Sequence, residues 1–458
     1  MYTDTRLLLI AAVSTLILGG CATRYDSRVV DQRTQELFGE STPPLLRDAP
    51  QAEDDSTEGV FTSAELTTYV DFALRHNAEL RGAFQSWRAS TERVAQVSTL
   101  PDPRLSFGEF LEEVQTRTGP QRRRFGLSQA FPWPGKLDAQ AKHATLRAEA
   151  AWERVEVVRL KVAREVEEAF HEYAYLGREL AITKELLELV KALEPVVQGR
   201  IRAGAGQEDL LRLQVEIGRL EDDLASIERR RPSLSARLSD AMNLPMAASA
   251  PLPLPGLDVP EGKPLDTAEL VRVALNESPA LRALEQELAT ARAAEDVAAF
   301  KRRPEFAARF DYIDTGDAIN SGTPGSGDDP LFLGLSLSLP VWTASYSAAE
   351  REARHLSRAA RAKLVDATSS LSAHVTEEAY RVDDALRRVR LYRESLLPRA
   401  REALQLTTVS YRSGSASVLD LLDSERALLE FELSLWRACR EYLQGEARLR
   451  ELIGGSIQ

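Results

Sequence analysis

Apolar residues recur along the chain at two spacings, one typical of long helices and the other of strands. Between Val155 and Leu180 the apolar positions are three or four residues apart, and seven such steps cover 25 residues (180 minus 155). This spacing is close to the 3.5-residue period of a coiled coil. The predicted helix, about residues 136–198, would be roughly 95 Å long at about 1.5 Å per residue. The pattern therefore predicts helices that are too long for a compact globular domain.

The pattern in the first half of the chain recurs in the second half. Leu80 and Leu281 are 201 residues apart (281 minus 80), and Gly204 and Gly414 are 210 apart (414 minus 204). Because such landmarks keep their order while the offset grows slowly, the chain is predicted to be a duplication. Each copy is predicted to hold a helix, two strands, a very long helix, a glycine turn and a last helix. The predicted helices are 63–100, 136–198 and 207–243 in the first copy, and 266–303, 345–410 and 418–452 in the second. The predicted divisions are a signal peptide at 1–20, an extended N-terminal segment at 21–60, a first repeat at 61–244, a proline-rich linker at 245–264 and a second repeat at 265–458.

Short stretches with a period of two residues lie between the predicted helices. Leu333, Leu335 and Leu337 alternate with glycine and serine, which gives one apolar face and one small polar face. Similar stretches begin near residues 105, 125 and 306, the first of them weaker because Glu109 falls on its apolar face. Half-buried strands packed on the helices are the alternative to membrane strands of about ten residues. Four strands cannot close a barrel, and an open edge in lipid leaves backbone groups unpaired, so several copies are expected to pool their strands.

Composition and charge exclude several classes of function. A net charge of -12 repels phosphates and gives no support to nucleic-acid binding. With 28% charged residues the chain is too polar for a bundle of membrane helices. The steps Glu168-x-x-His171 and Glu352-x-x-His355 have the spacing of a di-iron site, but they are 184 residues apart (352 minus 168) and so fall out of register with the repeat. We therefore predict no enzyme, no cofactor and no metal site.

The N-terminus predicts export and lipid attachment. Arg6 precedes an apolar run at 7–18, which is too short to span a bilayer and is typical of a signal peptide. The run ends in Leu18-Gly19-Gly20-Cys21, which resembles a lipoprotein cleavage site, so Cys21 is the predicted acylation site. A plain signal peptide with a chance cysteine is the alternative. The second cysteine, Cys439, is predicted to be a small core residue.

Three motifs together resemble the TolC-type outer-membrane efflux proteins. The first is the segment 131–136, Phe-Pro-Trp-Pro-Gly-Lys, between a predicted strand and a long helix. The others are the two glycine turns with the helix starts that follow them, at 204–214 and 411–423. The resemblance covers about residues 61–454. Sequence segments such as Leu-Pro-Asp-Pro at 100–103 resemble those of the branch of the family that works with heavy-metal cation pumps.

The resemblance implies a mainly α fold with membrane β structure. Three copies would form a homotrimer whose long coiled-coil helices build an α-barrel and whose strands, four from each copy, build a shared transmembrane β-barrel. It implies a passive duct in the outer membrane, extending into the periplasm, that receives cargo from a periplasmic adaptor and an inner-membrane pump of RND type. Adaptor contact would fall on the helical tips, at Arg202, Gly204, Gly206, Arg412 and Gly414. The alternative is a lipid-anchored periplasmic coiled-coil scaffold without a pore.

The family's acidic pore constriction carries over to Asp420 and Asp423, which are three residues apart and so share one helical face. Three copies would stack two carboxylate rings, which favour cations. The alternative is that aspartates in a first helical turn simply favour the positive end of the helix dipole. The family often has an arginine two residues after the tip glycine, where this chain has Ala416. Arg412, Arg202 and Arg200 are the candidates for its replacement.

Overall fold

The computed structural model describes residues 24–38, 64–202, 204, 206–244, 252–320 and 322–455. Two compact units make up the chain. Unit 1 comprises residues 1–31, 86–152 and 283–365, and unit 2 comprises 32–85, 153–282 and 366–458. Each unit therefore contains segments of both halves of the sequence, because a segment from each predicted repeat is needed to build its sheet or its helix cluster.

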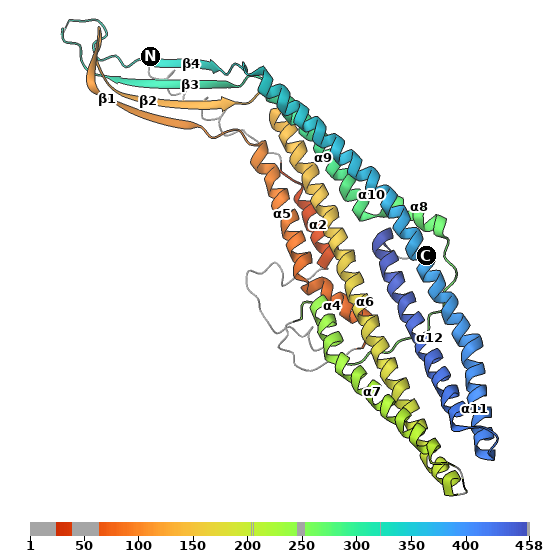
Figure 1. Cartoon of the computed structure of the whole chain (residues 1–458). Coiled ribbons are helices and arrows are strands. Elements are labelled where there is room, and N and C mark those ends of the chain that lie inside the picture. The colour runs from red at the N-terminus through yellow and green to blue at the C-terminus, as the bar shows by residue number, and fades with distance from the viewer. Residues whose placement is uncertain are drawn as a thin grey trace. The chain divides into compact units, whose positions relative to one another are not determined.

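The described elements follow the predicted order twice (Figure 1). The first half contains α4 (Leu66–His76), α5 (Ala78–Ser98), β1 (Arg104–Thr116), β2 (Gly119–Phe131), α6 (Lys136–Arg202) and α7 (Glu208–Ala241). The second half contains α8 (Thr267–Glu277), α9 (Pro279–Phe300), β3 (Phe306–Thr315), β4 (Leu331–Leu337), α10 (Thr343–Leu391), the π-helical turn η2 (Tyr392–Leu396), α11 (Leu397–Ser413) and α12 (Val418–Ile453). The mainly α fold class with a small antiparallel sheet is confirmed.

The first predicted helix of each half is in fact two helices. The breaks fall at Asn77 and Ser278, which are 201 residues apart (278 minus 77). Asn77 leaves the helical conformation, and its Oδ1 accepts hydrogen bonds from the backbone N–H groups of Glu79 (2.9 Å) and Leu80 (3.1 Å). An asparagine side chain that bonds nearby amides competes with the helix. Ser278 precedes Pro279, which disfavours the helical conformation of the residue before it.

Two further predictions of regular structure were wrong. The helix predicted at 345–410 is interrupted by η2, just before Pro398 at the start of α11. Proline has no N–H to continue the helical hydrogen bonds, and a π turn accommodates the missing bond. The N-terminal segment predicted to be extended contains the helix α2 (Ser27–Phe38). Its residues Val30, Thr34 and Leu37 are spaced by four and three positions, a helical pattern that is too short to stand out in the sequence.

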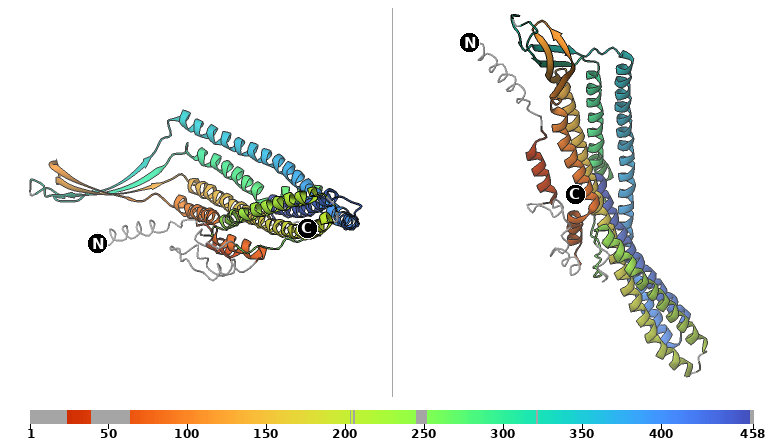
Figure 2. Two further views of the ribbon diagram at one scale, coloured as in Figure 1. Left: turned by 60° about the horizontal axis from the view of Figure 1, so that its bottom comes forward. Right: turned by 90° about the vertical axis from the view of Figure 1, so that its left-hand side faces the viewer.

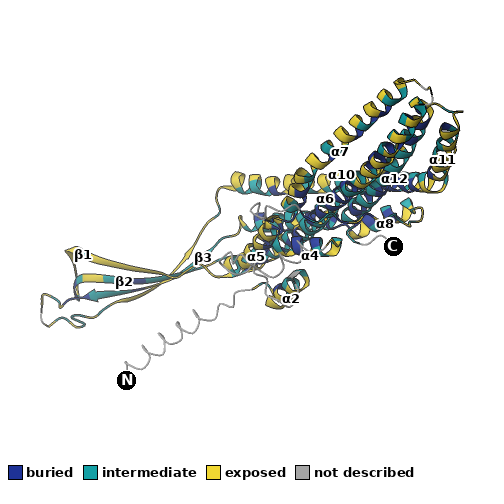
Figure 3. Cartoon of the chain, turned by 90° about the horizontal axis from the view of Figure 1, so that it is seen from below, coloured by how far each residue is buried: buried dark blue, intermediate teal, exposed yellow. Residues whose placement is uncertain are grey.

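The four strands form one antiparallel sheet in the order β1-β2-β3-β4, within unit 1 (Figure 2). The register aligns apolar side chains across all four strands: Phe107, Phe125, Tyr312 and Leu331 form one row, and Leu105, Leu127, Phe310 and Leu333 the next. The predicted alternation is confirmed. The exposed residues of β1 are visible in Figure 3.

Helix packing within unit 2 follows the predicted coiled-coil seam. Val162, Val166 and Tyr173 of α6 are buried in one apolar cluster with Tyr69 and Phe72 of α4. A second cluster joins α6, α7, α11 and α12 near their turns, and a third includes Cys439. Burial raises the pKa of the Cys439 thiol to about 12, so the thiol stays protonated at physiological pH. The prediction that Cys439 is a core residue is confirmed.

Candidate functional site

The residues predicted at the helical tips lie at two turns of unit 2. One turn, at Gly204, connects α6 to α7, and the other, at Gly414, connects α11 to α12. Both glycines have a positive φ, 102° and 85°, in the left-handed region that glycine reaches without strain. The remaining predicted tip residues, Arg202, Gly206 and Arg412, are exposed, as both turn glycines are. These five positions therefore offer solvent-facing surface at the ends of two helical hairpins.

An apolar cluster brings the two turns together. The clustered side chains come from all four helices and include Val197, Leu213, Tyr411, Val418 and Leu421, each of them fully buried. They repeat at the three- and four-residue spacing of helices that face a common core. The two turns of one chain thus share one packed interior, which is what the duplicated helical pattern requires.

Arg200 connects the two turns directly. Its Nη1 donates to the backbone carbonyl oxygens of Tyr411 (3.2 Å) and Ala416 (3.4 Å). Its guanidinium also lies 4.4 Å from the centre of the Tyr411 ring, within the range of a cation–π interaction. Of the three candidates for the missing tip arginine, Arg200 is therefore the one that reaches position 416. The arginine that contacts position 416 therefore comes from the other half of the duplication.

The two predicted constriction aspartates differ in their contacts. Both are exposed. The Asp420 carboxylate accepts hydrogen bonds from the Ser417 backbone N–H (2.9 Å) and hydroxyl (2.7 Å), and Ser417 in turn caps α12. These hydrogen bonds hold the pKa of Asp420 below its ordinary value. Asp423 lies 3.4 Å from Arg426. Asp420 thus has a structural role as part of a capping box, and both carboxylates remain open to solvent.

A buried carboxyl pair near these aspartates was missed by the sequence analysis. Glu216 of α7 and Glu425 of α12 are each 2% exposed. Glu216 pairs with Arg426 (2.6 Å) and Arg219 (2.9 Å), whereas Oε2 of Glu425 has no hydrogen-bond partner. Burial, and then the charge of Glu216, raise the pKa of Glu425 to about 7. A signal was present, because the two glutamates are 209 residues apart (425 minus 216), close to the offset of the tip glycines, and both occupy apolar-seam positions.

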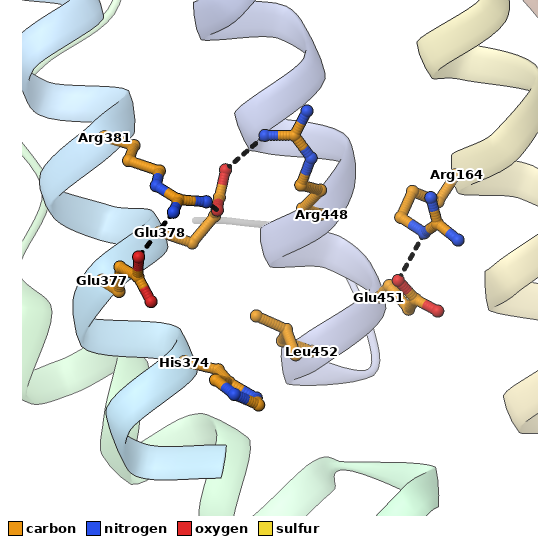
Figure 4. Close-up of a pocket in the computed structure, with 8 residues that line it drawn as sticks. All are labelled: Arg164, His374, Glu377, Glu378, Arg381, Arg448, Glu451 and Leu452. Atoms are coloured by element: carbon orange, nitrogen blue, oxygen red, sulfur yellow. Dashed lines mark hydrogen bonds and ion pairs between the residues drawn. The ribbon is translucent and has the colours of Figure 1, made fainter. Parts of the chain in front are cut away.

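A hollow of about 280 Å³ lies within unit 2, beside α6, α10 and α12 (Figure 4). Its charged side chains pair with one another: Glu378 lies 2.9 Å from Arg448 and 3.2 Å from Arg381, and Arg164 lies 2.6 Å from Glu451. Mutual pairing leaves no unbalanced charge to attract a ligand.

The first of the two E-x-x-H steps is likewise occupied by structural contacts. Arg164 (2.8 Å) and Arg448 (2.6 Å) bind Glu168. Burial lowers the pKa of His171 to about 4. In the part of the chain that the structure describes, no three His, Cys, Asp or Glu side chains gather as metal ligands. Within the same described ranges, no helix is both long enough and apolar enough to cross a membrane. The predicted acylation site, Cys21, lies outside them.

Comparison with known proteins matches both the sequence and the fold. Nodulation protein T of Rhizobium leguminosarum bv. trifolii is 24% identical, over 86% of this chain and 86% of the relative. The pyoverdine export outer membrane protein OpmQ of Pseudomonas putida is 23% identical, over 91% of this chain and 94% of the relative. Among solved structures, the outer membrane protein VceC of Vibrio cholerae superposes with a TM-score of 0.71 at 17% identity, covering 88% of this chain and all (100%) of that one. The outer-membrane channel OprN gives a TM-score of 0.68 at 20% identity, over 90% and 97%.

The family model described as outer membrane efflux protein matches residues 270–455. Residues 270–455 therefore belong to the outer membrane efflux protein family, and the whole chain has the fold of the TolC-type outer-membrane channels. This efflux protein is accordingly an outer-membrane channel component of a tripartite efflux pump and extends into the periplasm, and channels of its family are trimers. The resemblance predicted from the three motifs is confirmed. Assignment to the heavy-metal branch stays a prediction.

Proposed function

We propose that three copies of this efflux protein pool their strands into one transmembrane β-barrel and their helices into one periplasmic tunnel, through which cargo moves passively. The repeats at 61–244 and 265–458 would supply equal shares of both walls. The strongest support is the apolar face of the sheet, where Leu105, Leu333 and Leu335 are 81%, 75% and 85% exposed. Apolar surface left in water costs about 25 cal/mol per Å², and lipid would remove that cost.

The open edges of the sheet support the shared barrel. β1 and β4 are the outer strands of a four-stranded sheet, so each has one unpaired edge among the described residues. Unpaired backbone groups are not tolerated in hydrocarbon, and pairing between copies would satisfy them.

Planar-bilayer conductance of protein purified from outer membranes in mild detergent tests this proposal. We expect a detergent-stable trimer that forms small, cation-selective channels. A monomer that does not conduct would instead support the lipid-anchored scaffold without a pore.

We further propose that the exposed tips receive a periplasmic adaptor, which links them to an inner-membrane pump of RND type. The support is the solvent-facing surface around Gly204 and Gly414 at the ends of both hairpins. Proline cannot adopt the φ of 85° at Gly414, so Gly414→Pro should distort this end and abolish export. Trimer yield should be unchanged, and a loss of trimer would assign Gly414 a folding role instead.

The carboxylates of Asp420 and Asp423 are proposed to form the acidic constriction. Their exposure supports this role, since a ring of carboxylates must face the pore to select cations. The double variant Asp420→Asn/Asp423→Asn should weaken cation preference, and the amide oxygen of an asparagine at position 420 can still accept the hydrogen bonds from Ser417. Ser417→Ala is the matched control, because it removes the cap and keeps both charges. Unchanged selectivity in the double variant, or equal loss in the control, would remove the constriction assignment.

Lipid attachment at Cys21 is proposed as an additional anchor. The support is the sequence Leu18-Gly19-Gly20-Cys21. Cys21→Ser should abolish incorporation of labelled palmitate, while a protein held by its strands should stay in the outer membrane. Release of the variant from the membrane would favour the scaffold, and unlabelled wild-type protein would favour a plain signal peptide.

A further inference from the structure

The polar face of the sheet carries a cluster of charges that the efflux function described above does not use. Asp311 of β3 lies between two arginines, Arg124 of β2 and Arg309 of its own strand. Nη2 of Arg124 donates to Asp311 Oδ2 at 2.9 Å and its Nε donates to Oδ1 at 3.2 Å. Nε of Arg309 lies 2.9 Å from Asp311 Oδ2. The three residues share one face of the sheet, opposite the apolar rows.

The arginines of this cluster are accessible, whereas the aspartate is not. The Asp311 side chain is 0% exposed, and those of Arg124 and Arg309 are 42% and 46% exposed. Two positive charges against one negative charge leave a net charge of +1 in each copy. Arg104, which is exposed, adds another positive charge on the same face, because its partner in the register is Ser128, which in turn pairs with Arg309.

The absence of a side chain at Gly126 leaves the space that the Asp311 carboxylate fills. A Cβ at Gly126 would lie 2.5 Å from Asp311 Oδ1 and 2.5 Å from the Ser106 hydroxyl. Any side chain at position 126 would therefore displace the carboxylate that both guanidiniums contact. The buried carboxylate fixes the two guanidinium planes in place, and their outer donors stay free of it.

We propose that Arg124 and Arg309, held by Asp311, form an anion-binding ring on the channel wall, which takes solutes that carry a carboxylate or phosphate group. The inference rests on the proposed function, since only a pore shared by three copies turns the polar face inward and repeats the cluster three times. Rings of arginine select anions in pores, and planar guanidinium groups match both carboxylate and phosphate geometry. The duct would then contain two charge filters of opposite sign, an acidic one at the helical tips and a basic one on the sheet.

Block of single-channel current by inorganic phosphate tests the ring. The double variant Arg124→Gln/Arg309→Gln should need about tenfold or more phosphate for half-block, the loss expected when a charge-assisted contact is removed. It should also shift the reversal potential in a KCl gradient toward cation selectivity. Arg123→Gln is the matched control: Arg123 adjoins Arg124 in sequence but points to the apolar face, where it lies 3.9 Å from Glu109. That control should behave as wild type.

The double variant leaves Asp311 buried without a partner, so it is at risk of misfolding. Adding Asp311→Asn removes all three charges, and this triple variant should show the same weakened block in a stable trimer. Equal phosphate block in wild type and the triple variant would refute the anion-binding ring but leave the proposed channel function intact. Equal weakening in the Arg123→Gln control would show a general charge effect and also overturn it. A wild-type protein that forms no channel would overturn the proposed function and the ring together.

Discussion

The buried carboxyl pair predicts that this protein becomes less stable as the pH rises toward 7. Glu425 is 2% exposed, its Oε2 has no hydrogen-bond partner, and Glu216 lies close enough to raise its pKa. Arg426 and Arg219 both pair with Glu216, and neither forms an ion pair with Glu425. Replacing Glu425 by glutamine keeps the shape of the side chain and removes its ionisation.

The size of the effect follows from the two ionisation constants. The pKa of Glu425 is about 7 in the folded protein against an ordinary value of 4.5, a difference of about 2.5 (7 minus 4.5). Each pKa unit corresponds to about 1.4 kcal/mol, so the ionised carboxylate lowers the free energy of unfolding by about 3 kcal/mol. Because the folded-state pKa is the higher one, the folded protein holds an extra proton between the two values. Stability therefore falls as the pH rises through this window and is level above it.

Thermal unfolding of the detergent-solubilised trimer, followed by helical circular dichroism between pH 5 and pH 8, measures this dependence. The wild-type midpoint should fall with rising pH by several degrees more than that of Glu425→Gln, and the variant should be the more stable protein at pH 8. Glu430→Gln is the matched control, because Glu430 is an exposed carboxylate on the same helix. The reasoning is refuted if Glu425→Gln shows the wild-type pH dependence, or if it is the less stable protein at pH 8.

Three further substitutions test the turns and helix breaks. Gly454→Ala should destabilise the protein by about 1–2 kcal/mol, because Gly454 has a φ of 84° and a Cβ there would lie 2.5 Å from the carbonyl oxygen that ends α8. Gly455→Ala, where a Cβ meets nothing within 4 Å, should change the melting temperature little. Asn77→Ala should cost about 1 kcal/mol in the same melts through loss of the cap on α5, and an unchanged midpoint would contradict the capping role. Arg200→Met should raise open-channel conductance by releasing the two turns, whereas Arg202→Met, at an exposed position, should not. Equal conductance in both variants would argue against Arg200 holding the two turns together.

Much of the fold could be predicted because its helices and strands follow from the spacing of apolar residues along the chain. The seam around Val166 and the alternation around Leu335 each repeat over several turns or residues, so they identify helix and strand without knowledge of the neighbours. Breaks were harder to predict, because a single side chain decides them. At Asn77 two hydrogen bonds to the next turn end the helix, and at Pro398 one missing N–H produces a π turn.

The positions of the two turns could be predicted from the sequence, but the contacts between them could be predicted only in part. Gly204 and Gly414 mark the turns in the sequence because the left-handed conformation favours glycine. By contrast, the identity of the arginine that reaches position 416 depends on how two hairpins pack, and sequence alone left three candidates. The pair Glu216 and Glu425 was missed because glutamates on a helix are usually exposed.

The contacts of Arg200 affect how the proposed constriction at the helical tips could widen. In the proposed trimer, six hairpin turns would lie at the periplasmic end, two from each copy. Within one copy, the Arg200 contacts and the shared apolar cluster join both turns into a single body. Widening of the proposed constriction that keeps these contacts would then have to separate one copy from the next, so movement would fall at the interfaces between copies.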